Sequence, residues 1–427
     1  MTIIKLKRPS AVSGEINVSG AKNSLLPLIC ASLFCSKTHL INAVKLRDAE
    51  FLLDILSDIG LFYHWRGESE LSILNEHITN SHIHITSEKT SLIRYSTLLM
   101  GALIGIGTKK ITIPYPGGCS SFGTRPIDIH LLGFEAIGAI VNINESSIDI
   151  DCQQLKESAS YKLRFPSVGA SINLIFAAAS LKKGMKLYNI ALEPEVIELI
   201  NFCNKIGFEI KFIGERDISI LYNNKQKFDI TFSVMPDRIE TISYMILGSL
   251  LAQDHLIIKK PNILHTKIPR DFLSSIGILF DVNHDNIVVY RSKNLKPAKL
   301  ESGIYPQIGT DYQPLIACAL LYSDGNSEIY DPIYPKRFLY LKELEKVNFI
   351  STVMDGFAKL YGNPNHQVND DVELYCHDLR AGFACLMIGL LNHGETTLLN
   401  AEQILRGYGD IKNKLQKIGI SLEVIEN

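Results

Sequence analysis

The most regular feature of the chain is an apolar segment with helical periodicity that ends in a glycine turn and leads into a strand. The pattern occurs six times, at intervals of about seventy residues. The turn residues are Gly60, Gly138, Gly207, Gly277, Asn348 and Gly419. Glycine is expected there because the residue after a helix end commonly adopts the left-handed conformation, and asparagine is the usual substitute.

A second strand follows most of these turns across a short polar break. Residues 139–143 and 148–152 form one such pair, and residues 208–213 and 218–222 form another. The repeating unit is therefore helix, glycine turn and hairpin, and it is longer than the repeats of solenoid proteins. Three such units make a domain of about 210 residues, which is a common domain size.

The pattern predicts two α/β domains of three units each, with the crossing just before Met235-Pro236-Asp237. The first domain is expected over residues 22–235, and the second over residues 1–21 plus 236–427. A cleft between two such domains would be a natural place for a ligand.

Composition and charge exclude several classes of protein. Hydrophobic residues make up 46% of the chain and charged residues 21%, with 43 basic and 45 acidic side chains. This balance predicts a globular protein without nucleic-acid or membrane partners. The amino terminus has no signal-peptide pattern, and the longest apolar stretches, 25–35 and 98–107, are too short to span a bilayer.

The histidines and cysteines indicate a reducing compartment and no metal site. Eight cysteines show no CxxC pair and no regular spacing, so we expect reduced thiols in the cytoplasm. His82 and His84 alternate onto one strand face without a third ligand type nearby, which favours a solvated face over a metal site.

The segment from Pro116 to His130, PGGCSSFGTRPIDIH, is the strongest candidate for chemistry. Gly117 and Gly118 precede Cys119, and Arg125 follows within the same loop. A nearby guanidinium favours the thiolate, which is the reactive form of cysteine. The alternative is a buried, inert cysteine. Asp128 and His130 then alternate as they would on a strand.

Charged residues also stand where apolar helices are expected to begin, and these positions favour an anion site. Lys22, Arg94 and Asp311 have such positions, Arg380 precedes a long apolar run, and Arg406 lies among glycines. Helix amino termini attract phosphate and carboxylate groups. The alternatives are a solvated Lys22, a helix-capping Asp311 and a structural ion pair for Arg380.

Together these segments resemble the UDP-N-acetylglucosamine 1-carboxyvinyltransferases, a family of enolpyruvyl transferases. The resemblance runs from Gly14 nearly to the carboxyl terminus. It rests on SGAKN (19–23), PGGC and RPIDIH (116–130), FPSVGA (165–170), EPE (193–195), PDRIET (236–241), TD-Q (310–313), DLRA (378–381) and RGY (406–408). It implies two domains, each of three βαβαββ units arranged as an inside-out α/β barrel, with the active site in the cleft between them.

The resemblance also implies a reaction and a set of roles. The enolpyruvyl group of phosphoenolpyruvate would pass to the 3-hydroxyl of UDP-N-acetylglucosamine, with release of phosphate, in the first committed step of peptidoglycan synthesis. Lys22, Arg125 and Arg406 would hold phosphoenolpyruvate, Cys119 would protonate or trap it, and Asp311 would orient or deprotonate the hydroxyl. The UDP-sugar contacts would come from Asn23, Arg94, Arg125, Pro126, Ile127, Asp128, Ile129, Ser167, Val168, Gly169, Ile333 and Arg337.

The remaining implications concern Arg380, cofactors and partners. Arg380 would grip a carboxylate or help to close the domains. The family uses neither a metal nor a prosthetic group, so we expect no cofactor. The partners would be the small-molecule substrates, and a monomer is compatible with the pattern. Fosfomycin, an epoxide that mimics phosphoenolpyruvate, would alkylate Cys119 if the loop delivers the thiol.

Several departures from the family pattern leave the acceptor open. Cys119 and Arg125 are six residues apart where the family has five, so Ser120 is an alternative at the catalytic distance. Ile242 replaces a glycine, GTDYQP stands for PTDMQA, and PKRF (335–338) stands for ENRF. The alternatives are a divergent paralogue with another nucleotide or sugar acceptor, and a catalytically silent nucleotide-sugar binder.

Overall fold

The computed structural model describes residues 2–75, 78, 81–117, 127–223 and 228–426. By its internal contacts the chain divides into two compact units. Among the described residues, the first unit takes in residues 20–235, and the second takes in residues 2–19 together with residues 236–426. The expected boundary at residues 235 and 236 coincides with this division, and the expected start at residue 22 lies two residues inside the first unit.

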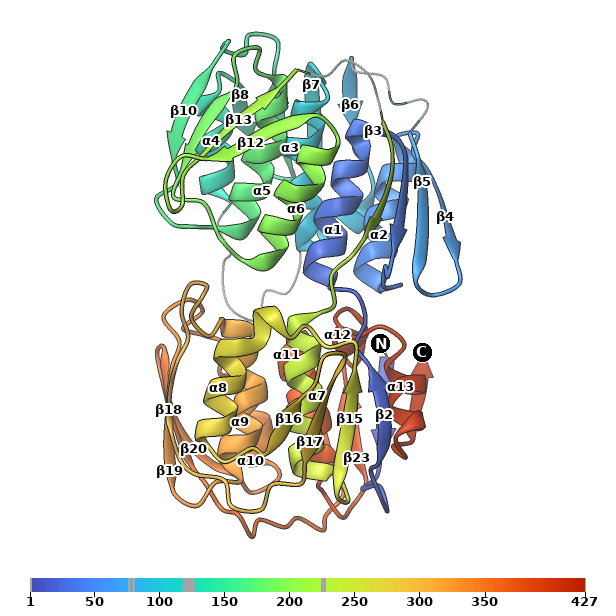
Figure 1. The fold of residues 1–427 in the computed structure, drawn as a ribbon, viewed down its shortest axis with the longest axis vertical. Helices are drawn as coiled ribbons and strands as arrows, with labels where there is room; N and C mark the ends of the chain where they lie inside the picture. Colours follow the sequence, from blue (N-terminus) through green and yellow to red (C-terminus); the bar gives the residue numbers. More distant parts are fainter. Residues whose placement is uncertain (1, 76–77, 79–80, 118–126, 224–227, 427) are drawn as a thin grey trace. The chain divides into compact units, whose positions relative to one another are not determined.

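The first unit contains helices and strands in regular alternation (Figure 1). Its helices are α1 (Lys22–Ala31), α2 (Arg47–Asp58), α3 (Leu98–Gly105), α4 (Asp128–Ala136), α5 (Val168–Ala177) and α6 (Pro194–Lys205), with 3₁₀ turns η1 (Ser32–Phe34), η2 (Glu88–Ser91), η3 (Arg94–Thr97) and η4 (Ala178–Ser180). Its strands are β3 (Cys35–Ile41), β4 (Phe62–Arg66), β5 (Glu70–Leu74), β6 (His82–His84), β7 (Lys110–Pro114), β8 (Ile140–Ile143), β9 (Ser147–Asp151), β10 (Ala159–Lys162), β11 (Met185–Tyr188), β12 (Phe208–Phe212), β13 (Ile218–Tyr222) and β14 (Phe228–Ser233).

The second unit has the same alternation. Its helices are α7 (Arg238–Leu251), α8 (Lys267–Ser275), α9 (Gln313–Leu321), α10 (Leu339–Glu345), α11 (Leu379–Gly389), α12 (Glu402–Leu405) and α13 (Ile411–Lys417), with 3₁₀ turns η5 (Leu264–Thr266) and η6 (Thr310–Tyr312). Its strands are β1 (Thr2–Leu6), β2 (Gly14–Asn17), β15 (His255–Lys259), β16 (Phe280–Val282), β17 (Asn286–Tyr290), β18 (Lys299–Glu301), β19 (Asn326–Tyr330), β20 (Ile350–Met354), β21 (Phe357–Tyr361), β22 (Val372–Tyr375), β23 (Thr396–Leu399) and β24 (Leu422–Glu426).

Within the described residues each unit holds three four-stranded sheets. The sheet β10-β11-β13-β12 shows the common plan. Strands β10 and β11 are parallel and joined by helix α5, and β13 then pairs antiparallel with both β11 and β12. A parallel pair needs a helical crossover, whereas an antiparallel pair needs only a hairpin, so this sheet is one βαβαββ unit. In three of the six sheets, one of the four strands comes from a distant part of the chain.

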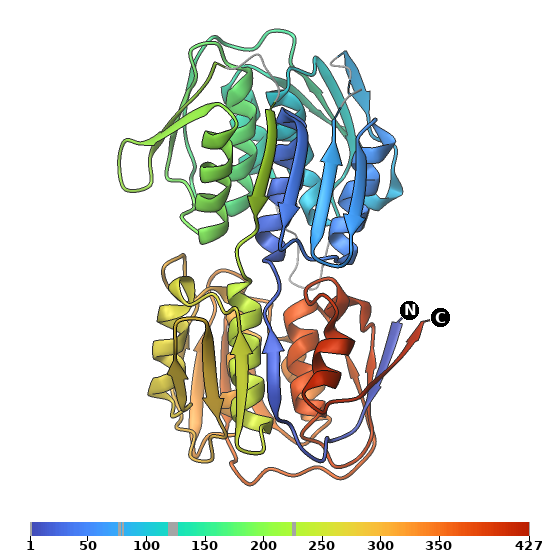
Figure 2. The ribbon, with the colours of Figure 1, turned by 45° about the vertical axis from the view of Figure 1, so that its right-hand side comes forward.

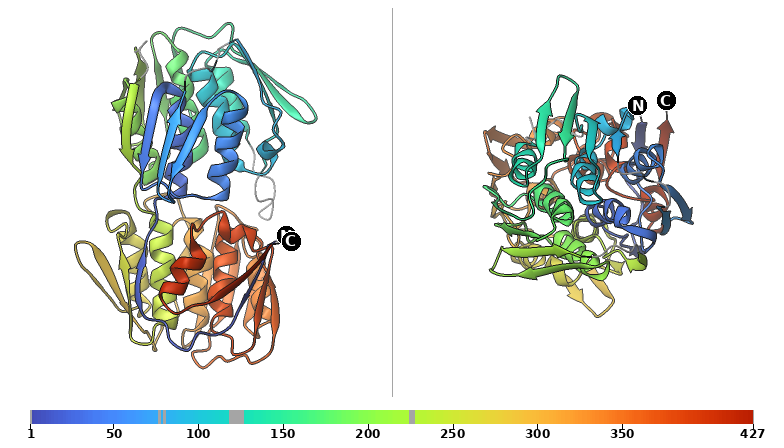
Figure 3. Two further views of the ribbon diagram at one scale, coloured as in Figure 1. Left: turned by 90° about the vertical axis from the view of Figure 1, so that its right-hand side faces the viewer. Right: turned by 90° about the horizontal axis from the view of Figure 1, so that it is seen from above.

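The helices lie inside and the sheets outside in each unit, as the views in Figure 3 show. All eight residues of α3 and all nine of α9 are buried, which explains why their sequences are apolar on every side. Each unit has its own hydrophobic core around such helices. The fold is therefore an α/β fold of two inside-out barrels, as expected from the sequence.

The six predicted turn residues all have the backbone conformation that the repeat requires. Their φ angles lie between 59° at Asn348 and 106° at Gly60. At Gly277 the N–H donates to the carbonyl of Ser274 and the N–H of Ile278 to that of Leu273, both at 3.0 Å. This pair of hydrogen bonds closes a helix end and needs a residue with positive φ. The prediction of the repeat is confirmed.

The amino-terminal residues complete two sheets of the second unit. Strand β1 lies between β23 and β24 and is antiparallel to both, while β2 is parallel to β15. Thr2 pairs with Glu426, so the two ends of the chain lie side by side (Figure 2). In the first unit, the corresponding place next to β3 is occupied by β14, which pairs with β3 in parallel.

One expectation about local structure was wrong. The alternation of Asp128 and His130 predicted a strand, but both residues lie on helix α4. The buried residues of this helix include Ile129, Leu131 and Phe134, which fit a helix facing the core as well as they fit a strand. In contrast, His82 and His84 lie exposed on β6, as the solvated strand face predicted.

Two further findings concern the apolar stretches and the thiols. In the described part of the chain, no helix is long and apolar enough to cross a membrane. The seven described cysteines are buried thiols. Burial raises the pKa of several of these thiols, Cys152 among them at about 12, so they are poor nucleophiles.

Candidate active site

Two helices of the second unit begin on an aspartate that caps the helix. Asp237 accepts hydrogen bonds from the N–H groups of Ile239 and Glu240, at 2.7 and 3.0 Å. Asp378 does the same for helix α11, through the N–H of Arg380 at 2.8 Å and that of Ala381 at 3.2 Å. A carboxylate cap satisfies amide groups that have no partner within the helix. Both caps fix an arginine in the first turn, Arg238 on α7 and Arg380 on α11.

Four charged residues from three distant segments meet in one ion cluster. Arg337 donates to Asp311 at 2.6 Å and contacts the carboxylate of Asp378 at 3.3 Å. The Nε of Arg380 lies 3.4 Å from the other carboxylate oxygen of Asp311. Both arginine side chains are at most 3% exposed, whereas that of Asp311 is 31% exposed. We call Asp311, Arg337, Asp378 and Arg380 the Asp311 cluster.

Asp311 is ionised because of this cluster. Burial alone would raise the pKa of its carboxyl, but the charges of Arg337, Arg380 and Arg238 outweigh burial and hold that pKa below its usual range. Asp311 lies in η6, and its side chain caps neither η6 nor α9. The capping alternative therefore does not describe it. An ionised carboxylate that is partly exposed can accept a hydrogen bond from a ligand hydroxyl.

Arg380 is held in place by an aromatic side chain from the RGY segment. Its guanidinium carbon lies 5.3 Å from the centre of the Tyr408 ring, and the Tyr408 hydroxyl lies 2.8 Å from Ser243 Oγ. The Nη1 atom of Arg380 is buried without a hydrogen-bond partner among the described residues. Arg406, two residues before Tyr408, donates to Gln403 at 3.0 Å.

A buried aspartate that the sequence analysis missed shapes the loop after β19. Asp331 accepts hydrogen bonds from the N–H groups of Ile333 and Tyr334, both at 3.0 Å. Its second oxygen accepts from the hydroxyl of Thr310 at 2.5 Å. The loop that carries Ile333 and Arg337 is thereby fixed next to Thr310, the neighbour of Asp311.

In the first unit, Lys22 begins helix α1 and is buried rather than solvated. Its Nζ lies 2.7 Å from the carboxylate of Asp48, which stands at the start of α2, and both side chains are at most 5% exposed. A buried ion pair of this kind keeps the lysine charged and its direction fixed. Asp48 was not singled out in the sequence, because a single acidic residue at a helix start is usually a surface feature.

The other candidate residues of the first unit lie at the starts of neighbouring helices. Asn23 accepts from the Tyr95 hydroxyl at 2.9 Å, next to Arg94 in η3. Asp128, at the start of α4, pairs with Arg164, a cation that the sequence analysis did not single out. Ser167 caps α5 by accepting from the N–H of Ala170 at 3.3 Å. The remaining candidates of this region are Ile127, Ile129, Val168 and Gly169, which belong to the same two helix starts.

Cys119, Ser120, Arg125 and Pro126 lie outside the described residues, and so does Gly118. Gly117 is described, and its role is steric: a Cβ atom there would stand 1.4 Å from the backbone oxygen of Ser91. Its N–H also donates to the carbonyl of Thr90 at 3.2 Å. A close approach of two backbones thus requires the first glycine of PGGC.

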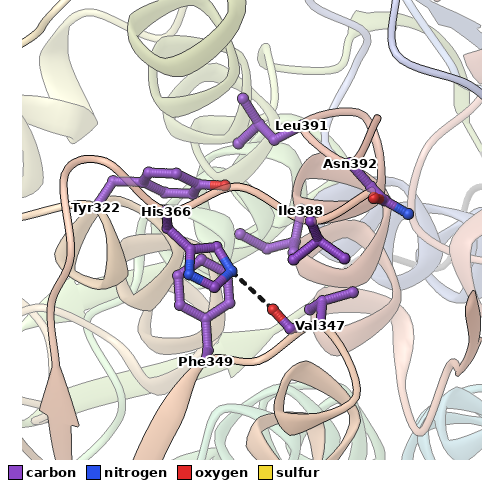
Figure 4. Close-up of a pocket in the computed structure, with 8 residues that line it drawn as sticks. Tyr322, Val347, Phe349, His366, Ile388, Leu391 and Asn392 are labelled. Atoms are coloured by element: carbon purple, nitrogen blue, oxygen red, sulfur yellow. Dashed lines mark hydrogen bonds between the residues drawn. The ribbon is translucent and has the colours of Figure 1, made fainter. Parts of the chain in front are cut away.

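Among the described residues, neither a small cavity in the second unit nor a metal-binding cluster offers an alternative candidate for the active site. The cavity has about 170 Å³ of empty space and is lined mainly by apolar residues around Tyr322, Phe349 and His366, whose Nε2 lies 2.7 Å from the carbonyl oxygen of Val347 (Figure 4). Pockets that hold drug-sized ligands are larger, at about 300–1,000 Å³. Among the described residues, no three His, Cys, Asp or Glu side chains are grouped as metal ligands would be.

One departure from the family pattern lies in the core and not in the site. Ile242 is fully buried on α7, within the hydrophobic cluster of the second unit. In PKRF, by contrast, Arg337 is part of the Asp311 cluster.

The sequence matches known enolpyruvyl transferases along almost its whole length. It matches the family described as EPSP synthase (3-phosphoshikimate 1-carboxyvinyltransferase) over residues 6–415. It is 32% identical over 424 residues to UDP-N-acetylglucosamine 1-carboxyvinyltransferase 2 of Staphylococcus aureus (strain MRSA252), with 98% of each chain covered. It is also 32% identical over 433 residues to UDP-N-acetylglucosamine 1-carboxyvinyltransferase 1 of Staphylococcus haemolyticus (strain JCSC1435), again with 98% of each covered.

Solved structures show the same fold at lower identity. The enolpyruvyl transferase NikO from Streptomyces tendae aligns with a TM-score of 0.88 at 21% identity, covering 99% of this chain and 98% of that one. EPSP synthase from Acinetobacter baumannii aligns with a TM-score of 0.73 at 14% identity over the full length of both chains. Two inside-out α/β units and a family match over residues 6–415 lead to one conclusion: the chain belongs to the EPSP synthase family of enolpyruvyl (1-carboxyvinyl) transferases.

Proposed function

We propose that the protein transfers the enolpyruvyl group of phosphoenolpyruvate to the 3-hydroxyl of UDP-N-acetylglucosamine and releases phosphate, the first committed step of peptidoglycan synthesis. The acceptor is suggested by relatives that carry this activity in their names at 32% identity over 98% of the chain. The observation that carries the chemistry is the Asp311 cluster, in which an ionised, partly exposed carboxylate lies between two buried arginines.

The reaction has two steps in this proposal. The hydroxyl oxygen bonds to carbon 2 of phosphoenolpyruvate, the hydroxyl proton is lost, and carbon 3 gains a proton. Phosphate then leaves carbon 2 with its bonding electrons, and carbon 3 loses a proton to restore the double bond. The steps need cations for the phosphate and the carboxylate, a proton acceptor near the hydroxyl and a proton donor at carbon 3.

We assign these roles to the residues that the family resemblance singles out. Lys22 and Arg406, with Arg125 outside the described residues, bind phosphoenolpyruvate. Arg380 offers its buried Nη1 to a carboxylate. Cys119 is assigned to the carbon 3 proton or to a covalent adduct, in line with the family. Asp311 orients the hydroxyl, since a carboxylate with a lowered pKa is a weak base and a good hydrogen-bond acceptor.

The test is phosphate release by purified protein with phosphoenolpyruvate and a panel of acceptors. The panel contains UDP-N-acetylglucosamine, other UDP-sugars, UDP, UMP and shikimate 3-phosphate. We expect release with UDP-N-acetylglucosamine, unchanged by a chelator. Release with only another nucleotide or sugar would assign the protein to a paralogous reaction, and acceptor binding without release would show a silent binder.

The same assay tests Asp311. Asp311→Asn should lower kcat by a factor on the order of 10²–10⁴, because the amide removes the charge that Arg337 and Arg380 share and presents no carboxylate to the hydroxyl. Asp254→Asn is the matched control, since Asp254 is an exposed aspartate of the same unit. Near-normal turnover of a folded Asp311→Asn protein would reduce Asp311 to a structural ion-pair partner.

A further inference from the structure

One buried amide joins three segments of the first unit. Asn173 lies on α5 and is fully buried. Its Oδ1 accepts from the N–H of Gly101 on α3 at 2.9 Å, and its Nδ2 donates to the carbonyl of Thr97 at 3.0 Å. The Nδ2 also lies 2.7 Å from Nδ1 of His130 on α4. These three contacts connect α5 with α3, with the 3₁₀ turn η3 and with α4.

The contacts fix the state of His130. A backbone N–H can only donate, so the atom facing Gly101 is the amide oxygen and the atom facing His130 is the amide nitrogen. An amide nitrogen can only donate, so Nδ1 of His130 is the acceptor and the ring proton is on Nε2. Burial, together with the charge of Arg94, lowers the pKa of His130 to about 3, which agrees with a neutral ring.

The packing around Asn173 leaves no room for it to move. Helices α3 and α5 touch backbone to backbone at two glycines: a Cβ at Gly101 would stand 2.2 Å from the carbonyl oxygen of Asn173, and one at Gly105 would stand 2.2 Å from that of Phe176. Interiors as tightly packed as this have discrete rather than continuous arrangements. The amide is thus a fixed cross-link and not an adaptable one.

The three linked segments all carry candidate nucleotide-sugar residues. Thr97 closes the 3₁₀ turn that begins at Arg94, and its hydroxyl donates to the carbonyl of Arg94 at 2.5 Å. His130 lies in the first turn of α4 together with Asp128 and Ile129. Asn173 lies on the helix that begins with Ser167, Val168 and Gly169.

From this juxtaposition we propose that Asn173 and His130 are positioning residues for the nucleotide-sugar acceptor, acting through Nδ1 of His130 rather than by touching the substrate. The inference rests on the proposed function for the ligand but not for the geometry. Misplacement of binding groups by about 1 Å is enough to lose much of their effect. Loss of the cross-link is therefore expected to weaken acceptor binding more than phosphoenolpyruvate binding.

A set of three variants at one position separates this role from direct contact. The Nε2 edge of His130 faces the start of α5, where a Cβ on Gly169 would stand 3.0 Å from its Cε1 and 3.4 Å from its Nε2. His130→Asn keeps an acceptor near the place of Nδ1, His130→Gln keeps a polar group near the place of Nε2, and His130→Leu keeps neither. If His130 acts through Asn173, only the His130→Asn variant should keep acceptor binding close to that of the wild type.

The first readout is binding of UDP-N-acetylglucosamine by calorimetry, with KM for both substrates and kcat. Relative to wild type, His130→Leu and His130→Gln should raise the acceptor Kd and KM about tenfold or more, and His130→Asn by about threefold or less, with a smaller change in KM for phosphoenolpyruvate. Rescue by Gln and not by Asn would overturn the proposal in favour of a direct contact.

The second readout needs no ligand, so it remains decisive if wild-type protein binds no UDP-N-acetylglucosamine and the proposed function fails. Amide hydrogen exchange in residues 94–101, 127–131 and 167–173 should speed up together in His130→Leu and stay near wild type in His130→Asn. Asn75→Leu is the control, because Asn75 is a buried amide of the same unit that donates to the carbonyl of Leu33 in η1, at 2.7 Å. Unchanged exchange in His130→Leu, or the same loss of acceptor binding in Asn75→Leu, would refute the positioning role.

Discussion

Two carboxyl groups that are largely buried have pKa values shifted in opposite directions, because only one of them has cations beside it. The charges of Arg337, Arg380 and Arg238 hold the pKa of Asp311 below its usual range. Glu198 lies on α6, where burial and the nearby Glu195 raise its pKa to about 8 in spite of a hydrogen bond from the N–H of Met235 at 2.8 Å. At neutral pH the first is charged, and the second is mostly protonated.

Glu198→Gln should therefore stabilise the protein at alkaline pH. The folded state keeps a proton on Glu198 up to about pH 8, whereas an unfolded glutamate loses it near pH 4.3. Stability consequently falls as pH rises from about 4 to 8. Glutamine removes this loss and can still accept from Met235, so the variant should gain on the order of 1 kcal/mol or more at pH 8 and little at pH 4.5.

The measurement is the unfolding midpoint of the Glu198→Gln variant and wild type at a series of pH values. Glu209→Gln is the control, since Glu209 is an exposed glutamate in the same unit. A difference between Glu198→Gln and wild type that is the same at pH 4.5 and pH 8 would show that Glu198 is charged in the folded protein.

At the scale of elements, the six predicted helix ends share one backbone conformation. Each ends on a residue with positive φ, at which the chain leaves the helix and enters a hairpin. Asn348 adopts a φ of 59°, within the range that asparagine tolerates, while Gly277 has a φ of 94°, where side chains are strained. Replacing Gly277 by alanine and replacing Asn348 by glycine should therefore change the stability of the protein by different amounts.

Gly277→Ala is expected to lower the free energy of unfolding by about 1–2 kcal/mol. Besides the strained backbone, the added Cβ would stand 2.9 Å from the carbonyl oxygen of Asn294. Asn348→Gly should stay within about 0.5 kcal/mol of wild type, because glycine adopts the same angle freely. Thermal or urea unfolding of the two variants decides this, and equal losses would mean that backbone conformation is not the determinant.

At the scale of the whole molecule, the amino-terminal segment does not belong to the unit that directly follows it in the sequence. Strands β1 and β2 belong to sheets of the second unit, although 216 residues separate Ser19 from Pro236. Strand β1 lies between β23 and β24, so its removal would leave two strand edges unpaired. The second unit is consequently assembled only from both ends of the chain.

A permuted fragment tests this assembly. Residues 236–427 alone should be unfolded or aggregated, whereas the same residues joined by a linker of about four residues to residues 1–19 should fold cooperatively. The linker can be short because Thr2 and Glu426 are paired neighbours. The comparison is made by circular dichroism and thermal unfolding, and a cooperative transition in the fragment without residues 1–19 would contradict it.

The sequence alone determined the features that depend on local physics. Apolar periodicity and the turn residues from Gly60 to Gly419 were sufficient for the six repeats, because a helix end and its left-handed residue are a few positions apart. The same reasoning correctly paired β8 with β9 and β12 with β13. It failed at Asp128 and His130, where a short apolar pattern fits a strand and a helix equally well.

Only the tertiary structure decided which charged and polar groups meet. Asp48, Asp331 and Asn173 gave no signal in the sequence, yet each fixes a candidate site residue. Asp311 had been compatible with capping, but Arg337 and Arg380, 26 and 69 residues away, determine its environment. Such contacts depend on how distant segments pack, and a buried charge is retained only where packing supplies its partner. Local pattern therefore predicts the elements, and packing alone determines the site.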